Sequence, residues 1–381
     1  MLVKTLFRKI KSLFHLIFFY FSIITILPLR ILLILLKPII NVRFTFISGD
    51  RIGSLTLDTF LEFGIIKEKK KKRTINFLVF FSPISNKFFL SKLQNFAIKN
   101  LKNTYLVEAN WFYKTLFNSF SVLNYPKKNF SENFAKDNFL DNNQQYFNKN
   151  LDYSKLSNNE NDKGFDLIKK FKIDTKKPWI CFHNRDSEYL NKFFPDRDFS
   201  HHSYRDFDIG SMLSAAELFT KNGYNVIRMG KIQKEQLSTT NPMIFDYPFS
   251  NLKSDFADIF LFSKCSAYFG SDSGVQNLAL VYNKPTFLIN FSLNILTQFM
   301  KGGLNSSRFH PYPFIFKNIF DPNKGRNLTL NEIFDHDLFA NYSSKYFNSL
   351  GLKHVSNSSD DILEFSQDVL EYLKCNWKLD H

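Results

Sequence analysis

The residues best suited to chemistry in this sequence form a short loop, Gly270-Ser271-Asp272-Ser273-Gly274. The apolar stretch 267–269 before it predicts a strand, and the stretch 275–281 after it predicts a helix. Backbone N–H groups at the start of a helix have no partner inside the helix, and the helix dipole favours an anion there. The pattern therefore indicates a phosphate site. The simpler alternative is that Asp272 or Ser273 only caps the helix.

A second glycine turn lies near the start of the chain. The alternating stretch 42–47 predicts a strand, residues 48–54 (SGDRIGS) follow it, and residues 55–63 have a helical pattern. A strand, a glycine loop and a helix in that order place the turn at the carboxyl end of a sheet, where ligands bind in open α/β folds. An ordinary tight turn explains Gly49 and Gly53 equally well.

Other combinations of reactive residues match no known chemistry. His201-His202 with His183 and Cys181 fit no metal-ligand spacing, so we interpret them as surface histidines. Asp206-Phe207-Asp208 spells the DxD of metal-dependent transferases, and we interpret it as a helix cap and loop. The chain has no G-x-S-x-G elbow, and its three cysteines suit a reducing cytoplasm better than a disulfide framework. We therefore expect no metal and no cofactor.

The elements that must position these residues alternate between strand and helix. This alternation predicts a doubly wound parallel sheet in the second half of the chain. Residues 127–177 are rich in Asn, Lys and Asp and predict a linker with surface loops, apart from a weak helix near 165–171. We expect three regions: a hydrophobic segment over 1–40, an α/β domain with its linker over 41–175, and a second α/β domain over 176–381. The predicted strands of the two domains are 42–47, 76–81 and 104–107, then 178–183, 224–229, 243–246, 267–269 and 286–290, with helices at 209–222, 254–262 and 275–281.

The net charge of +15 is concentrated near the N-terminus. Residues 1–43 contribute +7 without an acid and residues 67–73 contribute +5, so the remaining chain is nearly balanced. Nucleic-acid binders spread their basic residues along a groove-facing element, so we expect no nucleic-acid partner. Basic residues that flank an apolar segment are instead typical of contact with anionic lipid headgroups.

The apolar segment itself runs over residues 13–29 and resumes over 31–40. The first run is slightly shorter than the roughly 20 apolar residues of a membrane span. No small-x-small cleavage site follows it. The sequence therefore predicts attachment to a membrane surface, either by an interfacial helix pair that bends at Pro28 and Arg30 or by one spanning helix. Basic residues on both sides leave the orientation open.

Several stretches of the second half resemble a family of bacterial surface-polysaccharide glycosyltransferases and, more distantly, the heptosyltransferases. They are YRDFDIGSMLSAAELFTKNGYNVIRMGK (204–231), the stretch 239–274 that ends in YFGSDSG, NKPTFLIN (283–290) and GRNLTLNEIF (325–334). The resemblance extends over about 43–375. It implies an α/β fold of the GT-B type, in which two Rossmann-like doubly wound domains face a cleft, with the N-terminal hydrophobic segment as a membrane anchor.

The resemblance also implies roles for individual residues. Asp272, Ser273 and Gly274 match the loop that holds the diphosphate of the sugar donor. Arg205 falls where such enzymes place a cation near the leaving phosphate, and a fixed positive charge there needs no metal. The residues expected to bind the donor diphosphate and nucleotide are Arg185, Arg228, Gly230, Lys231, Ser271, Asp272, Ser273 and Gly274.

The candidate catalytic residues are Asp50, Ser54, His183 and Arg205. Ser54 stands where the relatives carry Asp or His, and a serine is not a general base at neutral pH. Asp50, His183, Asp186 or Glu188 would then have to accept the proton, unless the mechanism needs no base in that loop.

The resemblance thus implies a metal-independent glycosyltransferase without a cofactor. It would move a sugar from a nucleotide-diphosphate donor to a lipid-linked or surface polysaccharide acceptor, at the cytoplasmic face of a bacterial inner membrane. Two alternatives remain open: a pyruvyl or phosphate-group transferase of the same fold, and a non-catalytic assembly protein that has kept the fold and lost the chemistry.

Overall fold

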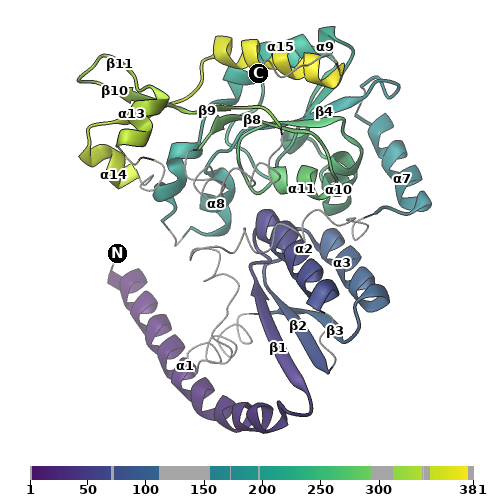
Figure 1. The fold of residues 1–381 in the computed structure, drawn as a ribbon, viewed down its shortest axis with the longest axis vertical. Helices are drawn as coiled ribbons and strands as arrows, with labels where there is room; N and C mark the ends of the chain where they lie inside the picture. The colour runs from purple at the N-terminus through teal and green to yellow at the C-terminus, as the bar shows by residue number, and fades with distance from the viewer. Residues whose placement is uncertain are drawn as a thin grey trace. The chain divides into compact units, whose positions relative to one another are not determined.

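The computed structural model describes residues 2–69, 73–110, 155–171, 173–195, 198–292, 312–336, 338 and 344–375. Within it the chain divides into two compact units, Met1–Ser154 and Lys155–His381 (Figure 1). Each unit contains its own parallel β-sheet.

The first unit is built on a three-stranded parallel sheet with the order β1-β2-β3. Two consecutive right-handed crossovers in one direction place both connecting helices, α2 and α3, on the same face. There the ring of Phe60 stacks on Phe89 with centroids 6.3 Å apart, and both side chains are fully buried. The elements of this unit are α1 (Leu2–Leu36), β1 (Asn41–Ile47), α2 (Ile52–Lys69), β2 (Thr74–Phe81), α3 (Lys87–Asn100) and β3 (Thr104–Ala109).

Helix α1 is one continuous helix that contains Pro28 (Figure 1). The sequence left open a helix pair with a bend at Pro28 and Arg30, and the structure has a single helix instead. A proline removes one hydrogen bond of a helix interior, and the bonds on either side can keep the helix intact. Many large apolar side chains between Leu13 and Ile40 are exposed, Ile24 to 70% and Leu35 to 68%. The described helices include none with the length and hydropathy of a membrane span.

The second unit contains a six-stranded parallel sheet with the order β6-β5-β4-β7-β8-β9. The chain starts in the middle at β4, moves outward to β5 and β6, and then returns to β7 on the other side of β4. This is the strand order of the dinucleotide-binding α/β fold. The doubly wound sheet predicted from the sequence is therefore confirmed in this unit. Its strands are β4 (Trp179–His183), β5 (Asn225–Arg228), β6 (Ile244–Asp246), β7 (Ala267–Gly270), β8 (Thr286–Phe291) and β9 (Phe314–Phe316).

Helices cover both faces of the second sheet, which explains why its strands read as unbroken apolar runs. All five residues of β4 are buried. On one face α9 (Leu213–Lys221) and α15 (Ser359–Leu373) pack together, where Phe182, Phe219 and Phe365 belong to one apolar cluster. On the other face lie α10 (Asp255–Lys264) and α11 (Gln276–Val281) (Figure 1). The predicted caps are confirmed, because Asp208 accepts a hydrogen bond from Gly210 N and Ser254 accepts one from Ala257 N.

The segment predicted to be linker and loops, with a weak helix near 165–171, contains a helix that begins earlier, α7 (Asn158–Lys169), and packs against α10. A capping box between Ser157 and Glu160 starts it. Only Gly164 and Ile168 are buried, so the helix has too narrow an apolar face to be recognised from its polar sequence. Gly164 is required, because a Cβ there would overlap the ring of Phe260.

The remaining elements of the second unit connect to the main sheet. A small antiparallel sheet has the order β11-β10-β12. These elements are α8 (Glu188–Phe193), the 3-10 helices η2 (Ser200–Arg205), η3 (Ile209–Met212) and η4 (Tyr247–Phe249), β10 (Asn318–Asp321), β11 (Arg326–Asn327), α13 (Leu330–Asp335), α14 (Ser344–Ser349) and β12 (Lys353–Val355).

Candidate functional site

The carboxyl ends of β4 and β7 meet where the strand order of the second sheet reverses. His183 at the end of β4 lies opposite Gly270 at the end of β7. Ser271 N donates to the His183 carbonyl at 2.9 Å, and a Cβ on Gly270 would overlap that carbonyl oxygen. Glycine is therefore needed at 270 for the two strand ends to approach. Ligands of open α/β sheets bind at such a reversal point, and here it brings together Asn184-Arg185-Asp186 and Ser271-Asp272-Ser273.

Three cationic side chains from three separate segments gather beside this point; we call Arg185, Arg205 and Lys317 the cation cluster. Arg185 follows β4, Arg205 ends η2, and Lys317 lies between β9 and β10. Arg205 Nη1 donates to the Asp272 carbonyl at 3.4 Å, and Lys317 is only 6% exposed. Burial, and then the nearby charge of Arg205, lower the pKa of Arg185 to about 10.

Two aspartates hold the cation cluster in place. The Asp206 carboxylate pairs with Arg185 and accepts a hydrogen bond from the Ser187 hydroxyl, and the Asp206 carbonyl accepts from Lys317 Nζ at 2.9 Å. The sequence predicted Asp206 as part of a cap and loop, whereas in the structure its carboxylate and carbonyl bind two of the three cations. With Asp206 and Asp272 ionised, three cations against two carboxylates leave one net positive charge. Arg205 Nε is buried and has no hydrogen-bond acceptor among the described residues.

Asp272 is buried in the loop after β7 and does not cap α11. It is 1% exposed, and its carboxylate accepts hydrogen bonds from the backbone and hydroxyl of Ser292 at the end of β8. Burial raises its pKa, whereas Arg205 and Ser292 oppose that rise. Helix α11 is six residues long and has no side-chain cap. Attraction for an anion here therefore comes from the cation cluster more than from the helix end.

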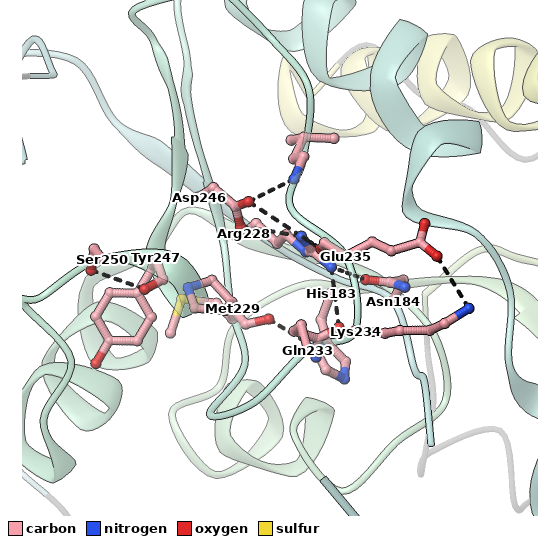
Figure 2. A network of polar contacts seen from close by, with 12 residues as sticks. His183, Asn184, Arg228, Met229, Gln233, Lys234, Glu235, Asp246, Tyr247 and Ser250 are labelled. Atoms are coloured by element: carbon pink, nitrogen blue, oxygen red, sulfur yellow. Dashed lines mark hydrogen bonds and ion pairs between the residues drawn. The ribbon is translucent and has the colours of Figure 1, made fainter. Parts of the chain in front are cut away.

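Arg228, predicted to bind the donor, lies in the protein interior at 1% exposure. Figure 2 shows its guanidinium at the centre of a polar network. Nη1 donates to the Glu235 carbonyl at 2.7 Å and to Asp246 Oδ1 at 3.2 Å. Nη2 donates to Asn184 Oδ1 and to Gln233 Oε1, both at 3.2 Å. These bonds give Arg228 a structural task, because they fix the loop after β5 against the end of β4.

Gly230 and Lys231 start that loop. Gly230 has a φ of +147°, and a Cβ there would lie 2.6 Å from Gln233 Nε2. Lys231 is exposed, and its Nζ lies 3.4 Å from Asp255 Oδ1 at the start of α10. Of the predicted nucleotide-binding residues, Lys231 is thus on the surface and Gly230 is buried. Their contact with a ligand stays a prediction.

His183 is an unsuitable general base at neutral pH. Its Nδ1 lies 2.9 Å from the Met229 carbonyl (Figure 2). A carbonyl only accepts hydrogen bonds, so Nδ1 carries the proton. Burial lowers the pKa of His183 to about 4, so the ring is neutral and only weakly basic at pH 7.

The other candidate catalytic residues, Asp50 and Ser54, belong to the first unit. Asp50 lies in the turn after β1, and Ser54 lies in the first turn of α2. Gly49, in the same turn, packs internally, because a Cβ there would come within 2.6 Å of Ile84 Cδ1 and 2.8 Å of the Phe81 carbonyl. Packing against the end of β2 is therefore enough to explain the glycine at position 49, which is not by itself a sign of a ligand site.

Sequence reasoning missed Asp58, which follows Ser54 by one turn of α2. Ser54 forms a side-chain hydrogen bond to Asp58, which lowers its pKa, but burial dominates and, with the charge of Glu62, raises the pKa to about 7. One turn further on, the fully buried Glu62 accepts from Arg43 Nη2 at 2.7 Å. The spacing S-x3-D-x3-E is visible in the sequence and predicts one helix face. Lys317 was also missed, and its only signal is a lysine inside the apolar run PFIFKNIF (313–320).

Among the residues that the structure describes, no three His, Cys, Asp or Glu side chains gather so that they could hold a metal ion. Asp206 and Asp208, the accidental DxD, serve as the partner of Arg185 and as the cap of η3.

Comparison with known proteins gives similar solved structures but no family model and no curated protein. ADP-heptose lipopolysaccharide heptosyltransferase II of E. coli has 14% identity and a TM-score of 0.37, over 65% of this chain and 84% of that one. A family 9 glycosyl transferase of Veillonella parvula has 11% identity and a TM-score of 0.45, over 87% and 97%. The iron-containing dodecameric heptosyltransferase TibC, solved with ADP-D-β-D-heptose, has 11% identity and a TM-score of 0.32, over 71% and 61%. These structures are glycosyltransferases of the type that the sequence distantly resembles.

Proposed function

We propose that this chain is a glycosyltransferase that moves a sugar from a nucleotide-diphosphate donor to a lipid-linked or surface polysaccharide acceptor. The observation that carries the proposal is the cation cluster, Arg185, Arg205 and Lys317, at the reversal point of the second sheet. Lys317 is buried with N–H groups to spare, and Arg205 Nε is buried without an acceptor among the described residues. Such groups are costly unless an anion binds them. Together with the resemblance of the loop 270–274, this favours a diphosphate as the anion.

The cation cluster would act mainly on the leaving group. When the bond between the sugar C1 and the diphosphate oxygen breaks, the electron pair leaves with that oxygen, and negative charge develops on the phosphate. Fixed guanidinium and ammonium groups stabilise this charge where water is excluded. In metal-dependent transferases a metal ion supplies this stabilisation. Because the cation cluster can supply it here, we propose a metal-independent reaction.

The acceptor hydroxyl needs a proton acceptor, and we assign this task to Asp58 acting through Ser54. In the proposed step the acceptor oxygen forms the bond to C1 and passes its proton to Ser54 Oγ, while the Ser54 proton moves to Asp58. A pKa of about 7 suits a general base at neutral pH. A serine can thus stand where the relatives carry Asp or His, because the base lies one helical turn further on.

Helix α1 supports a location at a membrane surface, which we propose to be the cytoplasmic face of a bacterial inner membrane. Exposed apolar side chains such as Phe14, Ile17 and Ile24 combine with the +7 of residues 1–43. Apolar burial and attraction to anionic lipids together give stable interfacial binding. Flotation of the full chain with phosphatidylglycerol vesicles, but much less with phosphatidylcholine vesicles, is the expected result. Equal recovery in the vesicle-free fraction with both lipids would refute it.

The donor site is tested by thermal unfolding of the full chain in detergent with ADP, UDP, GDP, CDP and their sugar conjugates. A ligand at 100 times its dissociation constant stabilises the folded state by about 2.7 kcal/mol. We expect one nucleotide to raise the melting temperature. Arg205→Ala should reduce the rise strongly, and Arg326→Ala, which changes an exposed arginine in the small sheet, should keep it.

The same assay separates the alternatives. If no nucleotide stabilises the protein, the non-catalytic assembly protein becomes the better interpretation. If a nucleotide sugar binds but incubation with acceptor glycans releases no nucleotide diphosphate, a transferase of another group on the same fold replaces the proposal.

A further inference from the structure

Lys317 is a buried cation whose bonding capacity the protein leaves largely unused. Its backbone N donates to the Phe291 carbonyl at 3.0 Å, which fixes the junction of β9 and β10 beside the end of β8. Its Nζ donates to the Asp206 carbonyl at 2.9 Å. An ammonium group has three N–H donors. Among the described residues no carboxylate forms an ion pair with this one.

The surroundings of Lys317 disfavour its charge. Burial lowers its pKa to about 8; the charge of Asp272 opposes this effect and outweighs the smaller lowering by Arg185, but it does not cancel the effect of burial. An ammonium held near guanidinium groups inside a protein destabilises the empty fold. An apolar side chain of similar length would fill the same space without this cost. The lysine is therefore better explained by a bound anion than by the stability of the sheet.

Resting on the function proposed above, we propose that Lys317 binds a phosphate oxygen of the nucleotide diphosphate, and that affinity for the ligand depends on the charge of this one side chain. A bound phosphate supplies a negative charge in direct contact, which no carboxylate among the described residues gives to Lys317, and it accepts the unused N–H groups. Protonated Lys317 then binds the anion much better than neutral Lys317. Ligand affinity and the protonation of Lys317 are therefore linked.

The charged and titratable groups around Lys317 come from four segments. His354 of β12 has its pKa lowered to about 4 by burial and by Lys317, so it stays neutral above pH 6. Arg185 has a pKa of about 10. Burial raises the pKa of Asp272 from its acidic reference value, and Arg205 opposes that rise. Asp206 is paired with Arg185.

The experiment measures binding of inorganic pyrophosphate to the full chain by calorimetry between pH 6.5 and pH 9.5. Wild type is compared with Lys317→Met and Lys317→Arg. We expect wild-type affinity to fall by up to about 10-fold per pH unit above pH 8, relative to Lys317→Met. Pyrophosphate changes its own charge equally for all variants, so the difference between variants isolates the side chain. Lys317→Met should bind weakly at every pH, and Lys317→Arg should bind well and keep its affinity to pH 9.5.

Thermal unfolding without ligand separates binding from a structural role. Lys317→Met should melt at the same temperature as wild type or higher at pH 7, because a disfavoured charge has been removed. A lower melting temperature together with unchanged pyrophosphate affinity would overturn the inference, as would wild-type affinity that is constant across pH 8 relative to Lys317→Met. If pyrophosphate binds as expected but no nucleotide sugar does, the glycosyltransferase proposal fails, and only the binding of a diphosphate by Lys317 is supported. If nucleotide sugars bind equally to wild type and Lys317→Met, the inference alone fails.

Discussion

The two units use the same plan of strand, loop and helix and fill it with opposite charges. In the first unit a hydroxyl and two carboxylates, Ser54, Asp58 and Glu62, follow one face of α2. In the second unit the cation cluster is drawn from three segments that lie far apart in the chain. A carboxylate suits the removal of a proton, and cations suit the stabilisation of a leaving phosphate. The difference teaches that two sheets of one plan can carry opposite charges, each suited to a different part of the proposed transfer reaction.

In each unit, burial shifts the pKa of one ionisable side chain so that its charged form is disfavoured. The pKa of Asp58 is raised to about 7, and that of Lys317 is lowered to about 8. A folded-state pKa above the unfolded value of an Asp means that deprotonation costs stability, and this cost is complete above pH 7. For Lys317 the cost of the charge is complete below pH 8 and is lost as the pH rises towards the unfolded value. Such costs are typical of functional sites.

The largest effect is expected from Asp58→Asn in the first unit. This change removes the proposed proton acceptor, so kcat for sugar transfer should fall by roughly 10²- to 10⁴-fold. Binding of the nucleotide sugar should be unchanged, because the cation cluster is intact. Steady-state kinetics and calorimetry on the same preparation measure the two quantities. Asp162→Asn, an exposed carboxylate of α7, is the matched control. An equal loss of binding would break the proposed division of labour.

A smaller effect is expected from Arg205→Ala in the second unit. A hydrogen bond to a charged group contributes about 1.5–3 kcal/mol, so affinity for the nucleotide diphosphate should fall by roughly 10- to 100-fold. Arg205→Lys should recover part of it, because the charge is kept. The pH dependence of kcat should not move, since Asp58 is untouched. Direct titration of the nucleotide measures the loss, and wild-type affinity in Arg205→Ala would refute the cationic assignment.

Glu62→Gln sharpens the comparison by changing the first unit without removing its base. The charge of Glu62 contributes to the raised pKa of Asp58, so its loss should move that pKa downwards. The acid limb of the pH profile of kcat should then move to lower pH, by up to about one unit, and stability should fall because Arg43 loses a buried partner. If the acid limb of the Glu62→Gln profile lies at the same pH as that of wild type, Asp58 is not the titrating group.

The smallest effect is expected from removal of metals. Because the cation cluster already supplies positive charge, dialysis against EDTA should leave the transfer rate within about twofold of its starting value. Addition of Mg²⁺ or Mn²⁺ should not raise it further. A loss of activity that a divalent metal restores would show that the fixed cations are insufficient.

The sequence alone determined most of the second fold, because strands buried on both faces and well-capped helices leave periodic signals. It indicated the strands on either side of the loop 270–274 and the caps Asp208 and Ser254. It indicated only the second half of α7, whose buried face is narrow, and it did not decide between one helix and a bent pair for α1. Asp58 was present as a spacing, but its raised pKa depends on burial that no spacing reveals.

Only the tertiary structure decided which charged residues meet. Arg185 and Lys317 are far apart in sequence, and they come together because β4, β7, β8 and β9 are parallel neighbours with their carboxyl ends at one edge. The same fold placed Arg228 in the interior, where its bonds to Asp246 and Asn184 occupy it. A sequence gives the type of each charged residue. The burial of that residue and its neighbours depend on the order of the strands, and they determine whether a cation stabilises the fold or is available to bind an anion.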